Sequence, residues 1–213
     1  MVGEGVLLEC LAHSQITEIL SVSRKSAGIA HPKLKEYITA DFLSLKEADE
    51  NLKGYDACFF CAGISSLGMK ETEYTRITYD TTLAFAEALS PKPQMSFFYV
   101  SGAGTDSSEK GRVMWTRVKG KTENDLMKLP FKQILAFRPA LMKFTDGQKN
   151  VSALNKFMSR FYPVMNFVFP NAASTMSQVG QAMIYAARHG YEKKVIEVKD
   201  IKILADRAIK TSE

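Results

Sequence analysis

Residue types that could do chemistry stand where predicted strands of this chain end. Five such residues are Arg24, Asp41, Gly63, Ser101 and Arg138. An arginine can hold a phosphate or carboxylate through two parallel hydrogen bonds. A glycine lets the backbone approach a ligand closely, and a serine hydroxyl can donate or accept a hydrogen bond. We therefore expect one ligand site, formed where these strands end.

Short β-rich runs alternate with longer helical patterns along the chain. Strands are expected at residues 19–23, 37–40, 55–61, 96–100, 133–137 and 195–198. Helices are expected at residues 5–13, 44–52, 71–89, 112–129, 151–161 and 174–188. This order predicts an α/β fold, a Rossmann-type doubly wound parallel sheet in three layers. In such a sheet the ligand lies beyond the carboxyl ends of the strands, where the five residues fall.

Length and composition are those of one globular domain. The chain has 213 residues, of which 46% are hydrophobic and 24% charged, with a net charge of +5. We predict a single domain over 1–213 with a smaller C-terminal part, 145–213, which the family resemblance described below implies to cover the substrate. The composition excludes a disordered or disulfide-stapled chain. The positive charge is modest and spread out, so no nucleic-acid partner is expected. No run of about 18 apolar residues occurs, so no transmembrane segment is predicted.

Cysteine usage points to a reducing compartment. The three cysteines, Cys10, Cys58 and Cys61, are too few and oddly numbered for a disulfide framework, and we expect a cytoplasmic location. Cys58 and Cys61 lie three apart in a predicted strand, so they point to opposite faces. They are therefore expected to be buried, inert thiols, and no metal site is predicted.

Seven segments together resemble a known family. They are Met1-Val2-Gly3-Glu4-Gly5, Ser21-Val22-Ser23-Arg24, Asp41-Phe42, Phe60-Cys61-Ala62-Gly63, Val100-Ser101-Gly102-Ala103, Lys119-Gly120-Lys121-Thr122-Glu123 and Phe137-Arg138-Pro139. Their order and spacing resemble the atypical short-chain dehydrogenase/reductases. Within these, they are most similar to the NAD(P)-binding epimerase-like proteins grouped with the Tat-interacting oxidoreductase. The resemblance covers nearly the whole chain.

The resemblance implies a function and its cofactor. It implies an NADP(H)-binding oxidoreductase or epimerase-like protein that acts on an unknown small substrate, which could be apolar. A non-catalytic NADP(H)-binding sensor or scaffold is the alternative. The implied cofactor-binding residues are Gly3, Arg24, Asp41, Phe42, Cys61, Ala62, Gly63, Lys119, Arg138 and Pro139.

Arg24 carries the choice between the two cofactors. Arg24 follows the strand expected at 19–23, which corresponds to the second strand of the family. At the end of that strand an acid binds the ribose hydroxyls of NAD, whereas an arginine can pair with the 2′-phosphate of NADP. NADP is therefore expected, with NAD possible. Asp41 would accept a hydrogen bond from the adenine amino group, although capping a helix is its other reading. Arg138 and Pro139 would pass beside the nicotinamide, although Arg138 could instead form an ion pair that ends its strand.

The front of the family pattern is incomplete. The family opens with a strand and a Gly-x-x-Gly-x-x-Gly turn, which places the cofactor pyrophosphate at a helix N-terminus. By this resemblance Gly3 supplies the last glycine alone, and the missing strand is the central one of the order 3-2-1-4-5-6. We expect Met1 to be an internal methionine of a longer protein; a shortened paralogue is the alternative.

The catalytic pattern also departs from the family. Family enzymes use a tyrosine, a lysine four residues later and an upstream serine. Ser101 and Lys119 match as catalytic residues, but Trp115 stands at the tyrosine position. An indole N–H has no useful acidity and cannot replace a phenol. Three outcomes stay open: another acid such as Ser101, Thr105 or a cofactor-held water, a different chemistry, or binding without turnover. Lys119 would hold the nicotinamide ribose in each.

A dense aromatic and methionine segment stands in the C-terminal part. Its members are Phe157, Met158, Phe161, Tyr162, Val164, Met165, Phe167, Val168 and Phe169. Core packing is the favoured reading, and an apolar substrate wall is a second. With Arg160 nearby, a peripheral membrane contact is the third. The helix expected at 71–89 could supply the face of a homodimer or be buried core.

Overall fold

The computed structural model describes residues 2–90, 93–145, 147–149, 151, 160–169 and 171–212. Its strands are β1 (Ile19–Ser23), β2 (Leu34–Ile38), β3 (Ala57–Phe60), β4 (Ser96–Val100), β5 (Gln133–Arg138), β6 (Leu141–Lys143), β7 (Ala173–Thr175) and β8 (Val195–Glu197). A four-stranded sheet has the order β3-β4-β5-β8, and β1-β2 and β6-β7 form two-stranded sheets. Every pair is parallel. The predicted α/β fold with parallel sheets is therefore confirmed.

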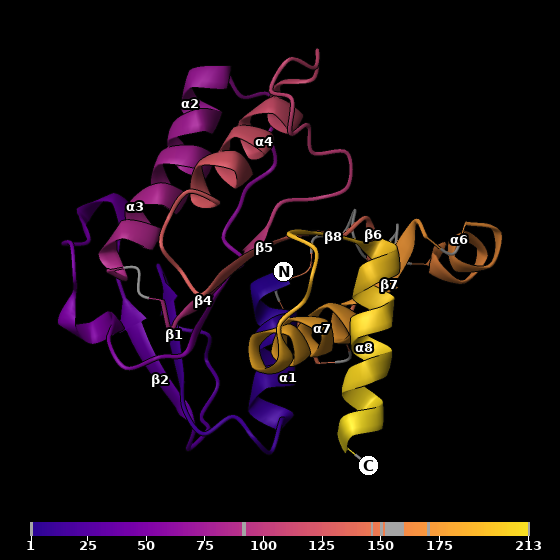
Figure 1. Ribbon diagram of the computed structural model, residues 1–213, viewed down its shortest axis with the longest axis horizontal. Helices are drawn as coiled ribbons and strands as arrows, with labels where there is room; N and C mark the ends of the chain where they lie inside the picture. Colours follow the sequence, from indigo (N-terminus) through magenta and orange to yellow (C-terminus); the bar gives the residue numbers. More distant parts are fainter. Residues whose placement is uncertain are drawn as a thin grey trace.

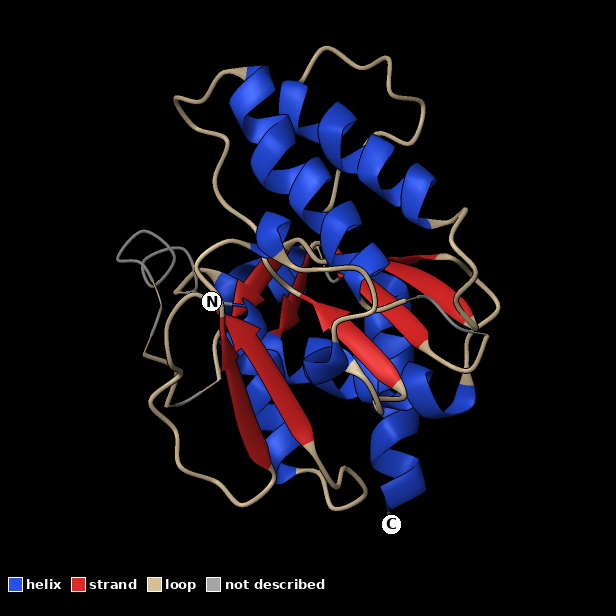
Figure 2. Ribbon diagram, turned by 90° about the vertical axis from the view of Figure 1, so that its left-hand side faces the viewer, coloured by secondary structure: helices blue, strands red, loops and turns tan. Residues whose placement is uncertain are grey.

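Helices cover both faces of the sheet (Figures 1 and 2). One layer consists of α1 (Val2–Ala12), α7 (Met176–His189) and α8 (Val198–Ser212). The other consists of α2 (Glu71–Thr75), the π-helical turn η3 (Arg76–Asp80), α3 (Thr81–Ala88) and α4 (Met114–Leu126). The short helix α6 (Tyr162–Val168) projects beyond these layers at the end next to β6 and β7 (Figure 1).

The alternation of side chains along β4 divides the core in two. Phe98 and Val100 join a cluster with α1, α7 and α8, whereas Phe97 and Tyr99 join a cluster with α3 and α4. Successive strand residues point to opposite faces, so a strand that is apolar throughout fits only where both faces are covered. This is why the continuous apolar runs of β4 and β5 form the middle of the sheet.

The hydrogen-bonded ladder is interrupted between β1 and β3. Within the described residues, β1 pairs only with β2, and β3 pairs only with β4. Apolar side chains nevertheless bridge the interruption, because Leu20 and Val22 of β1 pack on the cluster of Phe97, and Ile19 packs on the cluster of Phe98. The interruption falls where the family order places its central strand.

The segment after β1 differs from the sequence-based prediction. The strand expected at 37–40 is β2 at Leu34–Ile38, because its register matches the five residues of β1 one to one. The helix expected at 44–52 is wrong. Two 3-10 turns stand there instead, η1 (Phe42–Ser44) and η2 (Glu50–Leu52), each capped by an aspartate. Ala48 between them has a φ of 54°, which no α-helix accommodates.

The C-terminal part contains elements that the sequence did not reveal. They are β6, α6, β7 and the helix α8, which follows β8 directly. The helix expected at 174–188 is confirmed as α7, whereas most of the one expected at 151–161 lies outside the described residues. The helix expected at 71–89 is confirmed with a π-helical turn inside it. It buries Tyr74, Thr78 and Phe85 in the monomer, and a homodimer stays a prediction.

Gly120 fixes how closely α4 approaches the loop after β4. A Cβ at this position would lie 1.8 Å from the Asp106 carbonyl oxygen, a backbone atom that cannot move aside cheaply. Gly120→Ala is therefore expected to lower the free energy of unfolding by about 3 kcal/mol or more, as overpacking against backbone does. Urea unfolding measures this change. Gly63→Ala is the control, because nothing lies within 4 Å of its Cβ; equal stability losses in the two variants would contradict the packing.

Candidate functional site

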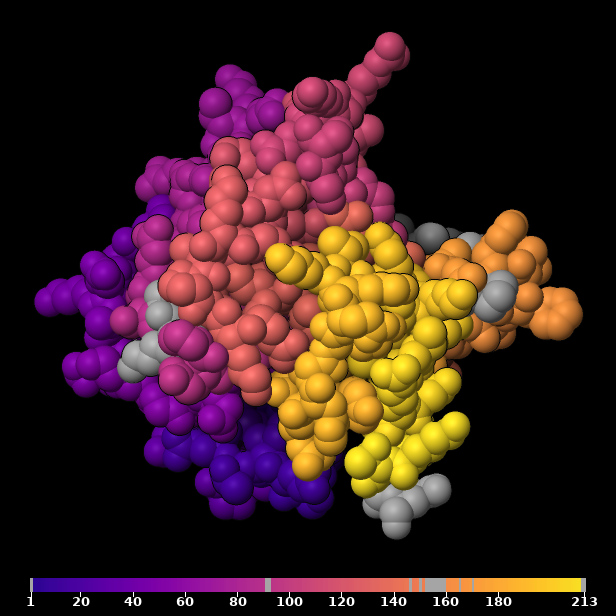
Figure 3. Space-filling model, viewed as in Figure 1, coloured from indigo at the N-terminus to yellow at the C-terminus, as the bar shows by residue number. Residues whose placement is uncertain are grey.

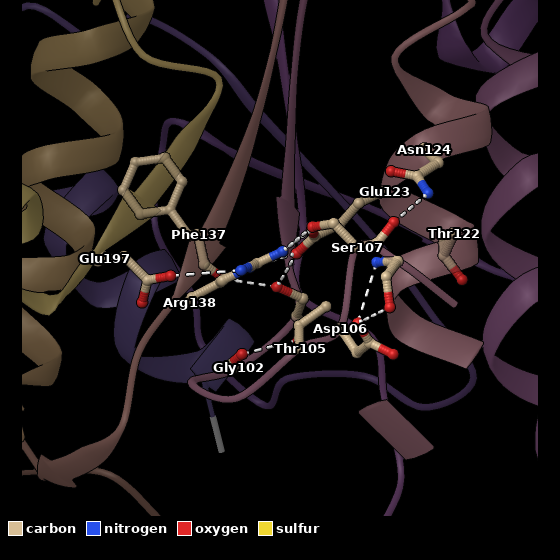
Figure 4. A network of polar contacts seen from close by, with 12 residues as sticks. Gly102, Thr105, Asp106, Ser107, Thr122, Glu123, Asn124, Phe137, Arg138 and Glu197 are labelled. Carbon is tan, nitrogen blue, oxygen red and sulfur yellow. Dashed lines mark hydrogen bonds and ion pairs between the residues drawn. The ribbon is translucent and has the colours of Figure 1, made fainter. Parts of the chain in front are cut away.

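A buried polar network lies at the carboxyl ends of β4 and β5 (Figure 4). Ser101 follows β4, Arg138 ends β5, and Glu123 comes from α4. The Ser101 hydroxyl donates to Glu123 Oε1 at 2.5 Å, and Arg138 Nε donates to the same oxygen at 3.0 Å. A second Arg138 nitrogen bonds the other Glu123 oxygen, which makes the ion pair bidentate. Glu123 is 2% exposed and Arg138 9%, so this pair is almost out of water.

Arg138 links this network to two further segments. Its guanidinium reaches Glu197 of β8 at 3.3 Å and the Ser107 hydroxyl at 2.6 Å. Burial by itself would lower the Arg138 pKa, but the hydrogen bonds and charges of Glu123 and Glu197 raise it above its ordinary value. The guanidinium therefore stays charged and joins β5, β8, α4 and the loop after β4.

Lys119 stands one helical turn before Glu123 on α4. Its Nζ donates to the carbonyl oxygen of Ser101, so the ammonium lies at the end of β4. Burial lowers the Lys119 pKa to about 8, and the nearby negative charge of Glu123 offsets this only in part. A lysine in this state exchanges a proton near neutral pH, unlike a solvated one.

Trp115 lies one turn before Lys119 and covers the loop after β4. That loop turns at Gly102 and Gly104, with φ values of 142° and 85° that favour glycine. A Cβ at either glycine would lie 3.8–3.9 Å from the indole ring. The indole of Trp115, which stands where the family pattern has a tyrosine, thus packs against this loop.

Of the cofactor-binding residues expected near β1, Arg24 and Asp41 are exposed, whereas Phe42 is partly buried. Arg24 is exposed and makes no hydrogen bond or ion pair with any described residue. The Asp41 carboxylate accepts a hydrogen bond from the Leu43 N–H and caps η1. Helix capping was the alternative role expected for Asp41 from the sequence. Phe42 packs edge to face on Phe85 at 5.5 Å between ring centroids.

Gly3 and Cys61 lie against each other. A Cβ on Gly3 would be 3.4 Å from the Cys61 Cβ. Gly3 stands in the first turn of α1, not in a loop before the helix, because α1 already begins at Val2. Burial raises the pKa of Cys61 to about 12, as expected for an inert thiol. Ala62 and Gly63, which follow, are exposed.

The structure brings together only part of the predicted site by direct contact. Ser101, Lys119, Arg138 and Pro139 form one group, in which the Pro139 carbonyl accepts the Ala103 N–H at 2.9 Å. Gly3 and Cys61 form a second group. Arg24 and Asp41 stand near the joined ends of β1 and β2, where Thr39 N–H donates to the Ser23 carbonyl. Within the described residues, no hydrogen bond or ion pair joins the functional residues of these three groups to one another.

Glu123 is the functional residue that sequence reasoning missed. It lies four residues after Lys119, on the same face of α4, and it is one of the few buried acids. The ion pair predicted as an alternative for Arg138 is present, and Glu123 is its partner. The sequence signal that could have identified Glu123 is an acid four residues after Lys119, on the same face of the predicted helix.

The aromatic segment does not pack as a core in its described part. Exposed fractions are 46% for Phe161, 62% for Val164, 88% for Phe167 and 58% for Phe169. The favoured core reading is therefore wrong for these residues, and they form a projecting apolar surface around α6 (Figure 3). Phe157 and Met158 lie outside the described residues. No helix in the described ranges is long and apolar enough to cross a membrane.

Comparison with known proteins supports the fold and identifies distant relatives. No family model matches the chain. The mitochondrial protein fmp52 of Emericella nidulans is 25% identical over 169 residues, covering 76% of this chain and 70% of the relative. The fmp52-1 protein of Aspergillus oryzae is 26% identical, covering 71% and 65%. The chain spans 62–71% of the four curated relatives, and all four are Fmp52 proteins, not the Tat-interacting group.

Solved structures with the same fold are NAD(P)-binding epimerases and related enzymes. UDP-N-acetylglucosamine 4-epimerase from Methanobrevibacter ruminantium superposes with a TM-score of 0.63 at 13% identity, covering 92% of this chain and 72% of that one. UDP-glucuronic acid 4-epimerase from Bacillus cereus, in complex with NAD, has a TM-score of 0.61 at 12% identity, covering 97% and 80%. The human epimerase family protein SDR39U1 with NADPH has a TM-score of 0.55 at 14% identity, covering 92% and 70%. At these identities the likeness establishes the Rossmann-type fold.

The expected cytoplasmic location is contradicted. All four curated relatives are named as mitochondrial proteins. The small number of cysteines argues against a disulfide framework, but it does not separate the cytoplasm from the inside of an organelle.

The buried ion pair yields the test of this network. Glu123→Gln leaves the Arg138 guanidinium without its bidentate partner, and we expect a loss of about 3–5 kcal/mol in the free energy of unfolding. Denaturant unfolding measures it, with Glu73→Gln on exposed α2 as the matched control. The double variant Glu123→Leu, Arg138→Met removes both charges and should recover most of the loss. A loss below about 1 kcal/mol in the single variant would contradict the pair's importance.

Proposed function

We propose that this chain binds NADP(H) and acts as an oxidoreductase or epimerase-like enzyme on a small substrate. The observation that carries the proposal is the environment of Lys119 on α4. This lysine is largely buried, its ammonium donates to the Ser101 carbonyl at the end of β4, and a buried acid lies next to it. A solvated structural lysine would have none of these features. The fold, shared with enzymes whose structures hold NAD or NADPH, supports the same proposal.

The residues present fit a nicotinamide cofactor at its two ends. The free guanidinium of Arg24 suits the 2′-phosphate on the adenosine ribose, and the Lys119 ammonium suits the hydroxyls of the other ribose. The remaining assignments, Gly3, Asp41, Phe42, Cys61, Ala62, Gly63, Arg138 and Pro139, belong to the proposal. Arg138 would act through backbone, because Glu123 holds its guanidinium. A bound nicotinamide would supply hydride transfer; the chain supplies binding and proton transfer.

A non-catalytic NADP(H) sensor is the second candidate, and Trp115 is the observation that favours it. The indole packs on the loop at Gly102 and Gly104 and offers no acid. The single domain over 1–213, with residues 145–213 covering the substrate, is part of either proposal. By analogy with the Fmp52 relatives, we infer an association with mitochondria.

Arg24 separates the two cofactors experimentally. Arg24→Ala removes the pairing with the 2′-phosphate, a charge-assisted bond worth about 1.5–3 kcal/mol, so NADPH binding should weaken about 10- to 100-fold. NADH binding should change less than threefold. Calorimetry with both nucleotides measures this. Lys132→Ala removes an exposed positive charge before the amino end of β5 and is the control. Equal losses for NADPH and NADH would overturn the assignment.

We also propose that the apolar surface around α6 contacts an anionic membrane surface. Arg160 precedes the segment and Lys143 ends the neighbouring strand β6, and both are exposed. Residues 160–169 contain no acid, so apolar and cationic groups coincide on one surface.

Vesicle binding tests this surface. Phe167→Ser should reduce co-sedimentation with vesicles of phosphatidylcholine and cardiolipin at least threefold, because it removes the most exposed phenylalanine of the segment. Leu67→Ser, which removes an exposed leucine on a different loop, is the matched control and should bind as the wild type does. Wild-type protein that stays in the supernatant would overturn the membrane contact.

A further inference from the structure

We infer that Lys119 is itself the proton-transfer residue of this site, exchanging a proton between its Nζ and the oxygen of a carbonyl or hydroxyl substrate. This inference rests on the proposed NADP(H)-dependent function and gives that function its acid and base. The role exceeds the binding of ribose, since the lysine would touch the reacting oxygen.

The other hydroxyls that the sequence offered as acids, those of Ser101 and Thr105, already donate their protons within the protein. The Ser101 hydroxyl faces Glu123 at 2.5 Å, and a carboxylate can only accept, so the serine proton is committed there. The Thr105 hydroxyl donates to the Gly102 carbonyl at 2.7 Å. Trp115 supplies no acid at the position of the family tyrosine. The Cys61 thiol has its pKa raised to about 12 by burial.

The Lys119 ammonium retains protons that point to no protein partner. An ammonium has three N–H donors, and its one hydrogen bond within the described residues goes to the Ser101 carbonyl. Two donors are thus left for a ligand. One can hold a ribose hydroxyl while the other meets a substrate oxygen, so binding and proton transfer do not compete for the same hydrogen.

Burial makes Lys119 titrate near neutral pH, and the charge that faces it acts in the opposite direction. Glu123 lies on its own helix and raises the Lys119 pKa, but by less than burial lowers it, so the pKa is about 8. Arg138 from β5 pairs with that carboxylate, and Glu197 from β8 in turn reaches Arg138.

The step balances in both directions. In reduction, a bound reduced nicotinamide, held by Arg24 and Lys119, would provide the hydride, that is, two electrons and one hydrogen, for the carbonyl carbon, while the carbonyl π pair moves to oxygen. The Nζ–H bond breaks, its electron pair remains on nitrogen, and a new O–H bond forms. Solvent then returns a proton to the neutral amine. In oxidation, the neutral amine accepts the hydroxyl proton.

The direction of the pH dependence follows from these forms. Reduction needs the ammonium, so its rate should be level below pH 8 and fall about tenfold per pH unit above it. Oxidation needs the neutral amine, so its rate should rise through the same range. A solvated lysine would place both changes near pH 10.5.

The test begins with a readout that needs no turnover. Wild-type protein is acetylated with acetic anhydride between pH 6 and 11, and peptide mapping follows Lys119 and Lys121. We expect a midpoint near pH 8 for Lys119 and a clearly higher one for Lys121, whose pKa is raised above its ordinary value by its hydrogen bond to Asp125. A midpoint near 10.5 for Lys119, or no acetylation of it at pH 11, would overturn the inference.

The second measurement compares Lys119→Arg with Lys121→Arg, an equal change on the exposed side of α4. Arginine keeps the charge and the hydrogen bond but does not deprotonate in this range. Lys119→Arg should bind NADPH within threefold of the wild type by calorimetry. It should reduce 4-nitrobenzaldehyde, cyclohexanone and phenanthrenequinone at least 100-fold more slowly. Lys121→Arg should match the wild type in both.

The outcomes separate this inference from the proposed function. Wild-type turnover by Lys119→Arg, or NADPH binding by the wild type with no reduction of any of the three carbonyl compounds, overturns proton transfer by Lys119 and leaves NADP(H) binding intact. No NADPH binding by the wild type overturns the proposed function and this inference with it. In that case the acetylation midpoint of Lys119 still reports whether the amine itself is perturbed.

Discussion

The bidentate ion pair between Glu123 and Arg138 is the interaction on which the candidate site depends. Each charge is almost fully removed from water, and neither could stay there alone, because an uncompensated buried charge costs several kcal/mol. Glu123 also accepts a hydrogen bond from the Ser101 hydroxyl, and Arg138 also donates to Ser107 and Glu197. A helix, two strands and the loop after β4 therefore share one electrostatic anchor. Arg24 lies outside this network and is exposed.

The strands of the sheet were predictable, and so were the positions where they end. β4 and β5 are short runs of apolar residues bounded by polar loops, and such runs form buried parallel strands whatever their exact neighbours. Ser101 and Arg138 follow from those strand ends. Pattern alone failed at 44–52, where Asp41 and Asp49 each satisfy a backbone N–H locally and divide the chain into two turns. These side-chain to backbone hydrogen bonds are an alternative to the hydrogen bonds of a helix, and here they replace them.

The contacts between elements were not predictable to the same degree. The buried residues of α4 include the apolar Val118 and Leu126, but also Thr116, Gly120, Thr122 and Glu123, which are small or polar. Apolar periodicity therefore marks only part of the buried face, and it does not identify Glu123 as the partner of Arg138. The opposite error occurred at 160–169, where an apolar composition predicted burial. Composition gives the cost of exposing a segment, but it does not say whether another element lies near enough to cover it.

Helix α4 concentrates the chemistry of the site on one line. Trp115, Lys119 and Glu123 are spaced by four residues and stack along the face that meets the ends of β4 and β5. Trp115 packs on the loop, Lys119 holds the carbonyl at the end of the strand, and Glu123 anchors Arg138. Gly120 lets this face approach the backbone at Asp106, so the depth of the helix is set by a missing side chain. Because the three side chains lie on one face of the same helix, the packing of Trp115 on the loop is compatible with the contact that Lys119 makes one turn later.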